Sequence, residues 1–342
     1  MISDDVFTRA KTDHIFVMSD DTGLLQHATY SVPCLQHGYS SDDNARGLIM
    51  AVMLYQQSPS EQIERLLYRY LAFLCHARND NGTFRNFLDY SRKFVEIIGS
   101  EDTFGRCLWG LSFALSQSTL PTNMREAIRS CLKPSIQFCA KLNSPRSIAY
   151  SILGLRYLES EAAQKMLVFQ ADALVTQYGK YQDGDWHWFE DSFAYSNSVL
   201  PHALLAAYQK VPNPRYLHVA EKSLDFLETK TFREEYYKPI GCNGWLEKNG
   251  TQAEYDEQPV EAGETTIAYL DAFAITGKKR YFELATRAFA WFYGRNSQSL
   301  HMIDPDTGGC YDGICAHGLN RNEGAESLVS YWIAYLSMHK YL

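Results

Sequence analysis

Acidic residues recur in pairs just before long apolar segments of this 342-residue sequence. The groups are Asp42-Asp43, Glu101-Asp102, Glu190-Asp191, Asp256-Glu257 with Glu261, and Glu323 with Glu326. Two carboxyl groups that flank one bond can divide acid and base work. In glycoside hydrolysis one protonates the leaving oxygen, and the other activates water or attacks the anomeric carbon. We therefore nominate as catalytic Asp42, Asp43, Glu101, Asp102, Glu190, Asp191 and Glu323.

Each of these acids also has a purely structural explanation. Backbone N–H groups at a helix start lack intrahelical partners and carry partial positive charge, so an acidic side chain there caps and stabilises the helix. Capping does not explain the repetition, because a ring of carboxylates around one opening would repel itself. Arginines also lie near the acids in sequence, namely Arg46, Arg106 and Arg321.

Aromatic residues accompany the acids between Asp185 and Asp191, where Trp186, Trp188 and Phe189 directly precede an acidic pair. Flat aromatic faces stack on the C–H faces of sugar rings, while carboxylates and amides bind hydroxyl groups. The alternative is that Trp188 and Phe189 only fasten the helix start to the core. We expect a sugar to be bound by Tyr39, Arg46, Arg106, Trp186, His187, Trp188, Trp245, Gln258, Glu261, Arg321 and Asn322.

The elements that must position these groups are two kinds of helix in alternation. Six segments are apolar on nearly every side, as expected of helices that are buried all round. They cover residues 45–55, 107–115, 148–158, 199–208, 267–275 and 328–336. Amphipathic segments with apolar residues at i, i+3, i+4 and i+7 lie between them. These cover residues 61–78, 124–142, 161–178, 214–229 and 279–294.

This alternation predicts an all-α fold, an (α/α)6 toroid in which six inner helices are wrapped by an outer layer. An open solenoid would also explain it, but only a ring brings every polar motif to one end. A sixth outer helix is missing, so we expect the segment through Gln36 to close the circle. Loops 181–189 and 230–258 should form short strands over the open end. No linker interrupts the chain, which predicts one domain over residues 1–342.

Composition and motifs exclude several classes of function. A net charge of -8 argues against a nucleic-acid partner, and we expect no membrane-spanning helix or leader, hence a cytoplasmic protein. The 8 cysteines form no CxxC pair, and Cys310, Cys315 and His317 lack standard zinc-site spacing. Asp42-Asp43-Asn44 does not extend to the DDxxD motif of terpene synthases. Without a P-loop, GxGxxG or GxSxG motif, we expect neither metal nor cofactor.

Six segments together resemble a bacterial family within the six-hairpin glycosidase superfamily. They read SDDTGLLQH (19–27), HGYSSDDNAR (37–46), GSED with GR (99–106), WFED (188–191), DEQPVEA (256–262) and NRNEGAE (320–326), and so cover nearly the whole chain. The resemblance implies an (α/α)6 toroid. Members of the family occur alone or as a C-terminal extension of glycosyltransferases, often beside genes for β-mannoside metabolism. A functional association with a glycosyltransferase and a mannoside substrate are therefore implied.

Three functions follow from these patterns. The leading one is a glycoside hydrolase that acts on an oligosaccharide by carboxylate acid–base catalysis. The second is a non-catalytic carbohydrate-binding or accessory toroid that works with a separate glycosyltransferase. The third is a sugar epimerase, in which His37, His187 and His317 would carry out the proton transfers.

Overall fold

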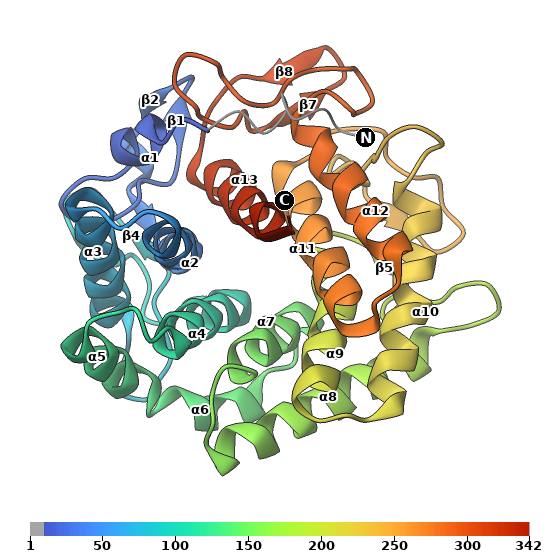
Figure 1. The fold of residues 1–342 in the computed structure, drawn as a ribbon, viewed down its shortest axis with the longest axis horizontal. Coiled ribbons are helices and arrows are strands. Elements are labelled where there is room, and N and C mark those ends of the chain that lie inside the picture. Colours follow the sequence, from blue (N-terminus) through green and yellow to red (C-terminus); the bar gives the residue numbers. More distant parts are fainter. Residues whose placement is uncertain (1–9, 342) are drawn as a thin grey trace.

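Helices dominate the computed structural model, which describes residues 10–341 (Figure 1). The inner ring consists of α2 (Ser41–Gln57), α4 (Glu101–Ser116), α7 (Pro145–Leu155), α9 (Val199–Lys210), α11 (Pro259–Thr276) and α13 (Ala325–Met338). Each inner helix packs against the next, and α13 packs against α2, so the ring is closed. The predicted all-α toroid is confirmed, and the open solenoid is wrong.

An outer layer of helices surrounds this ring. It consists of α3 (Glu61–Ala77), α5 (Thr122–Leu132), α6 (Ser135–Phe138), α8 (Glu161–Tyr181), α10 (Pro214–Thr231) and α12 (Lys279–Phe289). The predicted inward stripe of α3 is confirmed, since Leu66, Tyr70 and Leu74 are fully buried. The segment 124–142 is not one helix, as the sequence had suggested. It divides at Pro134, whose ring and missing N–H disrupt helical hydrogen bonding, into α5, α6 and the 3-10 turn Cys139–Lys141.

The N-terminal segment closes the outer layer, as predicted for the part that the structure describes. The short helix α1 (Asp13–Val17) takes the sixth outer position, followed by strands β1 (Ala28–Thr29) and β2 (Val32–Pro33) and the 3-10 turn Leu35–His37. His14 Nε2 lies 2.9 Å from the carbonyl oxygen of Glu323, and Lys11 Nζ donates a hydrogen bond of 2.6 Å to that of Pro305. Residues 1–9 of the segment lie outside the described chain.

Neighbouring inner helices approach one another at glycines. A Cβ atom added at Gly110 of α4 would lie 2.4 Å from the carbonyl oxygen of Ala45 in α2, and one at Gly263 of α11 would lie 2.7 Å from that of Ser330 in α13. Any larger side chain would therefore force these backbones apart. The narrow ring that holds the polar residues together depends on glycine at these positions.

Short antiparallel strand pairs lie beside the N-terminal ends of the inner helices. They are β3 (Tyr39–Ser40) with β4 (Phe87–Leu88), β5 (Ser192–Phe193) with β6 (Leu246–Glu247), and β7 (Gly313–Cys315) with β8 (Gly318–Asn320). The strand predicted within 230–258 is thus present as β6, whereas 181–189 holds only a single bridge between Asp183 and Trp186. Within residues 10–341, no helix has the length and apolar character needed to cross a membrane.

Candidate active site

A cavity of about 350 Å³ opens where the starts of α2 and α13 meet. Helix α2 contributes Asp42, Asp43 and Arg46, and the C-terminal part of the chain contributes Asp312, Glu326 and Ser327. The other walls include Gln26, His27, Ser40, Asn86, Phe87, Gln258 and Asn320. Most of these side chains can donate or accept hydrogen bonds, and the volume falls at the lower end of the usual range for small-molecule sites.

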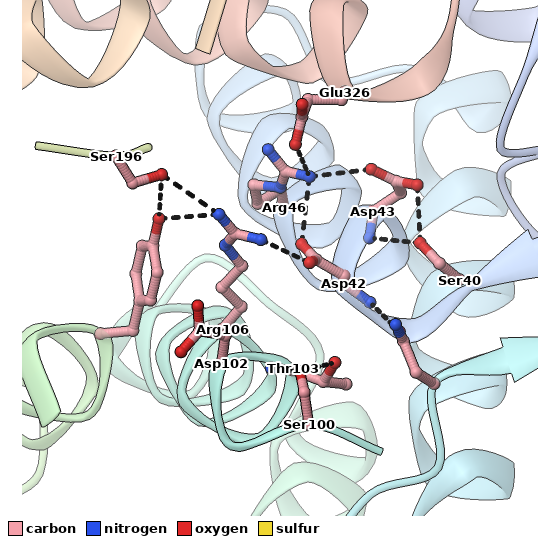
Figure 2. A network of polar contacts seen from close by, with 12 residues as sticks. Ser40, Asp42, Asp43, Arg46, Ser100, Asp102, Thr103, Arg106, Ser196 and Glu326 are labelled. Atoms are coloured by element: carbon pink, nitrogen blue, oxygen red, sulfur yellow. Dashed lines mark hydrogen bonds and ion pairs between the residues drawn. The ribbon is translucent and has the colours of Figure 1, made fainter. Parts of the chain in front are cut away.

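Three carboxylates converge on one nitrogen of Arg46 inside this cavity (Figure 2). Arg46 Nη2 lies 3.0 Å from Asp42 Oδ1, 2.9 Å from Asp43 Oδ1 and 3.1 Å from Glu326 Oε2. Because each oxygen is about 3 Å from the same atom, no two of them can be more than about 6 Å apart. The arginine side chain is 4% exposed, so water screens these interactions only weakly.

The start of α2 explains how these groups are held. Ser40 caps the helix, since its Oγ accepts the Asp43 N–H at 3.0 Å and donates to Asp43 Oδ2 at 2.6 Å. Ser40 is thus an ordinary N-cap, and its hydroxyl group also holds the side chain of Asp43. Arg46 follows Asp43 by three residues and Asp42 by four, the spacings that place side chains on one helix face. The contact with the N-cap Ser40 therefore explains the position of Asp43 Oδ2, while the other oxygen, Oδ1, contacts Arg46.

Burial and charge give the two neighbouring carboxyl groups of α2 different pKa values. Burial alone would raise the pKa of Asp42, but the charges of Arg106 and Arg46 outweigh it and hold that pKa below its ordinary value. Burial raises the pKa of Asp43 to about 7 in spite of Arg46, and the nearby carboxylates of Asp42 and Glu326 add to the increase. Near neutral pH, Asp42 is ionised while Asp43 can hold a proton.

A second polar layer continues the network across the ring (Figure 2). Arg106 of α4 pairs with Asp42 and donates a hydrogen bond of 2.8 Å to Tyr150 Oη of α7. Tyr150 Oη donates to Glu264 Oε1 of α11 at 2.7 Å and contacts Ser196 Oγ at 2.9 Å. Burial raises the pKa of Glu264. These contacts connect inner helices that are far apart in the sequence.

Glu101 and Asp102, two of the nominated acids, lie outside the cavity lining and connect α4 to its neighbours. Glu101 accepts hydrogen bonds from the backbone N–H groups of Asn143 (2.7 Å) and Ser144 (2.8 Å) at the start of α7. Asp102 accepts from Ser144 Oγ at 3.1 Å and from Tyr195 Oη at 2.5 Å. Glu101 therefore acts as a cap, but for the neighbouring helix α7 and not for its own helix.

Glu190 and Asp191 also lie apart from the cavity lining. Glu190 pairs with Arg146 of α7, with Oε2 and Nη1 2.7 Å apart, and its side chain is 24% exposed. Asp191 is exposed, and its carbonyl oxygen accepts the Lys248 N–H at 2.6 Å. The structure therefore brings together Asp42 and Asp43 but not these two acids.

Glu323, another nominated acid, lies outside the cavity lining. The chain enters α13 only at Ala325, so Glu323 precedes the first helical turn instead of lying in it. Glu323 is 1% exposed, and its Oε2 accepts a hydrogen bond of 2.7 Å from Thr307 and lies 3.4 Å from His14 Nδ1. Glu326, one turn further on, supplies the carboxylate of this helix.

Three of the aromatic residues expected to bind a sugar, Trp186, Trp188 and Tyr39, are buried and lie outside the cavity lining. Trp188 has no exposed surface and stacks on Phe193 at 4.1 Å between ring centroids. Trp186 is 8% exposed and donates its indole N–H to the Glu190 carbonyl at 2.8 Å. Tyr39 is 1% exposed. Trp188 thus belongs to the core, where it packs against β5, while the following helix α9 begins only at Val199. The phenylalanine in the cavity lining is Phe87.

The remaining nominated residues are divided between the cavity and its surroundings. Gln258 lines the cavity, and Arg106 lies directly behind Asp42. Glu261 is buried and accepts the Asn197 N–H at 3.3 Å, and Asn322 Oδ1 accepts the Tyr30 N–H at 2.9 Å. Four further side chains lie outside the cavity lining: His187 and Trp245 are partly buried, and Arg321 and His317 are exposed.

Sequence reasoning missed Arg146, Tyr150 and Glu264, which are buried members of the polar network. A signal was present: each is a charged or hydroxylated residue within the first two turns of an inner helix that is otherwise largely apolar. A charged group in such a place needs a buried partner. Among residues 10–341, no cluster of three or more His, Cys, Asp and Glu side chains could hold a metal ion.

No family model matches the sequence, and no curated protein matches it. Solved structures match over the whole chain. A sugar epimerase from a ruminal bacterium has a TM-score of 0.77 at 11% identity, covering 100% of both chains. A D-mannose isomerase has a TM-score of 0.73 at 12% identity, covering 99% of this chain and 98% of that one. A GH76 α-mannanase of Bacteroides thetaiotaomicron has a TM-score of 0.65 at 14% identity, covering 96% and 93%.

The three proteins are carbohydrate enzymes by name, but at such low identity the likeness extends to the fold alone. It agrees with the resemblance inferred from the six sequence segments. The chain has an (α/α)6 toroid fold.

Proposed function

We propose that the protein is a glycoside hydrolase that binds an oligosaccharide in the cavity between α2 and α13. The observation that carries this proposal is the meeting of Asp42, Asp43 and Glu326 on a single guanidinium nitrogen, with opposite pKa shifts on the two aspartates. Carboxyl groups whose environments move their pKa values apart are suited to separate acid and base roles.

In this proposal Asp43 is the general acid. Its pKa of about 7 lets it keep a proton at neutral pH and transfer that proton to the glycosidic oxygen. Glu326, whose side chain is 46% exposed, faces the same cavity and attacks the anomeric carbon. Water then releases the sugar, with Asp43 acting as the base. Asp42 remains ionised and positions Arg46 and Arg106.

The spacing of the carboxylates supports retention of configuration. The oxygens of Asp43 and Glu326 that contact Arg46 are at most about 6 Å apart. Carboxyl groups about 5–5.5 Å apart are typical of retaining glycosidases, whereas inverting enzymes need about 6.5–9.5 Å to admit a water molecule.

Unpaired polar atoms support a ligand rich in hydroxyl groups. Among the described residues, the buried atoms Arg46 Nε, Arg46 Nη1 and Glu264 Oε2 have no hydrogen-bond partner. Buried polar groups are almost always paired, so these atoms are available to sugar hydroxyls or ordered water. Amides of Gln26, Asn86 and Gln258 line the same cavity. The resemblance noted above makes a mannoside the first substrate to test.

The proposal is tested by incubating the protein with β-mannosides, β-glucosides and uncharged oligosaccharides and measuring released sugar. Asp43→Asn and Glu326→Gln should each lower turnover by at least about a hundredfold, because the amides cannot transfer a proton or attack. Asp191→Asn, which changes an exposed acid that precedes β5 and lies outside the cavity lining, is the matched control and should retain full turnover. Absence of released sugar across the panel, or full turnover by Asp43→Asn, would contradict the proposal.

A sugar epimerase is the second candidate, favoured by one observation. His27 lines the cavity, with its ring centroid 4.7 Å from that of His37. Burial and the neighbouring His37 lower the pKa of His27, so it is a neutral imidazole that could accept a proton. An epimerase would introduce solvent deuterium into recovered mannose or cellobiose, and a hydrolase would not. Binding of an oligosaccharide without either reaction would indicate an accessory role beside a glycosyltransferase.

A further inference from the structure

We infer that Phe87 is the platform for the leaving group, so that the enzyme acts on glycosides whose leaving group has an apolar face. This inference rests on the proposed function, because it identifies the part of the substrate that departs. The apolar face could belong to a second sugar ring, through its C–H groups, or to an aryl or alkyl aglycone.

The register of two short strands places Phe87 beside the proposed acid. Phe87 of β4 pairs directly with Ser40 of β3, and Ser40 donates a hydrogen bond of 2.6 Å to Asp43. Phe87 and Asp43 both line the cavity. The acid protonates the oxygen of the leaving group, so the leaving group must lie on the side of the cavity where Asp43 and Phe87 are found.

Backbone hydrogen bonds hold Phe87 in place. Its N–H donates to Glu96 Oε1 at 2.6 Å, and its carbonyl oxygen accepts the Val95 N–H at 3.0 Å. Leu88 and Phe94 form the next bridge of this hairpin. Side chains alternate between the faces of paired strands. Leu88 is buried, and Phe87 accordingly lies on the outer face with 41% of its surface exposed.

The surface beyond Phe87 is also apolar. Val95, Ile97 and Ile98 of the same segment are 64%, 83% and 52% exposed. Single exposed apolar residues are common, but three within four positions of one segment, with Val95 hydrogen-bonded to the backbone of Phe87, are typical of a binding surface. Aliphatic groups beside an aromatic ring offer contact area and no hydrogen bonds. They therefore suit the apolar part of a ligand, whose polar sugar occupies the cavity.

The first test compares Phe87→Ala with the parent on three β-mannosides: mannosyl fluoride, an aryl mannoside and mannobiose. Loss of the platform should lower kcat/KM about tenfold for the two substrates with large leaving groups and leave the fluoride within twofold, because fluoride cannot contact the ring. Phe87→Tyr should retain activity. Phe169→Ala, an aromatic 58% exposed on α8, is the matched control and should change none of the three.

The pattern of losses distinguishes the sources of the apolar face. A loss confined to mannobiose assigns the platform to a sugar ring, and a loss confined to the aryl mannoside assigns it to an aglycone. Equal losses on all three substrates, or none, would overturn the inference while leaving the hydrolase proposal intact.

A binding experiment separates this inference from the proposed function. Calorimetry on Asp43→Asn, with and without Phe87→Ala, measures affinity for mannose and mannobiose without turnover. The second substitution should weaken mannobiose or an aryl mannoside about tenfold and leave mannose unchanged. If the parent cleaves no glycoside, the hydrolase proposal fails, yet this comparison still decides the role of Phe87. Unchanged affinities, or no binding of any of these ligands, would refute the inference.

Discussion

Asp42 and Asp43 are adjacent in the sequence, yet their surroundings give them different charges. Asp42 has two arginine partners, Arg46 and Arg106, whereas Asp43 has Arg46 and a serine hydroxyl. A second arginine is therefore the physical difference between an ionised carboxylate and one with a pKa of about 7. The sequence pattern identified both residues but could not rank them, since the ranking depends on partners from other helices.

The pH dependence of turnover follows from Asp43. A general acid must be protonated, so kcat should be highest below pH 7 and fall as the pH rises through about 7, the pKa of Asp43. The measurement is kcat against pH for an alkyl glycoside, whose poor leaving group needs a proton. In Asp43→Asn the alkaline decline should disappear from the residual activity. An unchanged decline in the variant would assign the acid to another residue.

The raised pKa of Asp43 also makes the free energy of unfolding depend on pH. The direction is opposite to that for an ordinary salt-bridged carboxylate, whose pKa is lowered on folding. A folded-state pKa raised above the unfolded value means that the folded protein binds the proton more tightly. The contribution to the free energy of unfolding is then greatest at low pH and decreases as the pH rises towards 7. At neutral pH the buried Asp43 therefore contributes less to stability than it does in acid.

At the scale of elements, the inner helices depend on close backbone approach. Gly110 of α4 meets the Ala45 carbonyl of α2, whereas Gly179, in the last turns of outer helix α8, has no atom within 4 Å of an added Cβ. Replacement by alanine should therefore change the free energy of unfolding in opposite directions at the two glycines. One is required by packing, and the other carries only the entropic cost of glycine in a helix.

Gly110→Ala should lower the free energy of unfolding by about 2–3 kcal/mol, because the ring must expand to admit the methyl group. Gly179→Ala should raise it by about 0.5 kcal/mol. Urea denaturation of both variants and the parent tests this pair. Equal stability of Gly110→Ala and the parent would mean that α2 and α4 are less tightly packed than described.

Hydrophobic periodicity predicted the helices well and the loops poorly. Burial on every side of α2 and the inward stripe of α3 are properties of local spacing, so the sequence contains them. The burial of Trp188 and Glu323 could not be predicted, because their contacts with Phe193 and Thr307 arise in irregular loops that have no hydrophobic period. Glu264 was missed because its partner Tyr150 is 114 residues away.

At the scale of the whole molecule, a second, partly buried ionic cluster joins the end of α7 to α9 and α11. Arg156 Nη1 lies 2.5 Å from Asp271 Oδ2, and His202 Nε2 lies 2.8 Å from the same oxygen. Burial alone would raise the pKa of Asp271, but Arg156 and His202 outweigh it and hold that pKa well below its ordinary value. Asp271 is therefore ionised in the folded protein at neutral pH, and its partners stabilise the ring.

Asp271→Asn should lower the free energy of unfolding at pH 7 by about 1.5–2 kcal/mol, because it leaves the partly buried Arg156 without its counter-charge. A lowered folded-state pKa gives stability that is present above the unfolded pKa, near 4, and is lost as the pH falls below it. Thermal melts between pH 7 and pH 3 should show the gap between variant and parent shrinking with acid. A gap that stays constant would contradict this role.

The contact of α13 with α2 has a consequence for biosynthesis. A nascent chain that has emerged through α11 already contains Asp42, Asp43 and Arg46, but Glu326, Asp312 and Ser327 have yet to be made. Until α13 is made, the faces of α2 and α11 that pack against it have no partner. A chain that stops after α11 therefore lacks one wall of the cavity and cannot complete it.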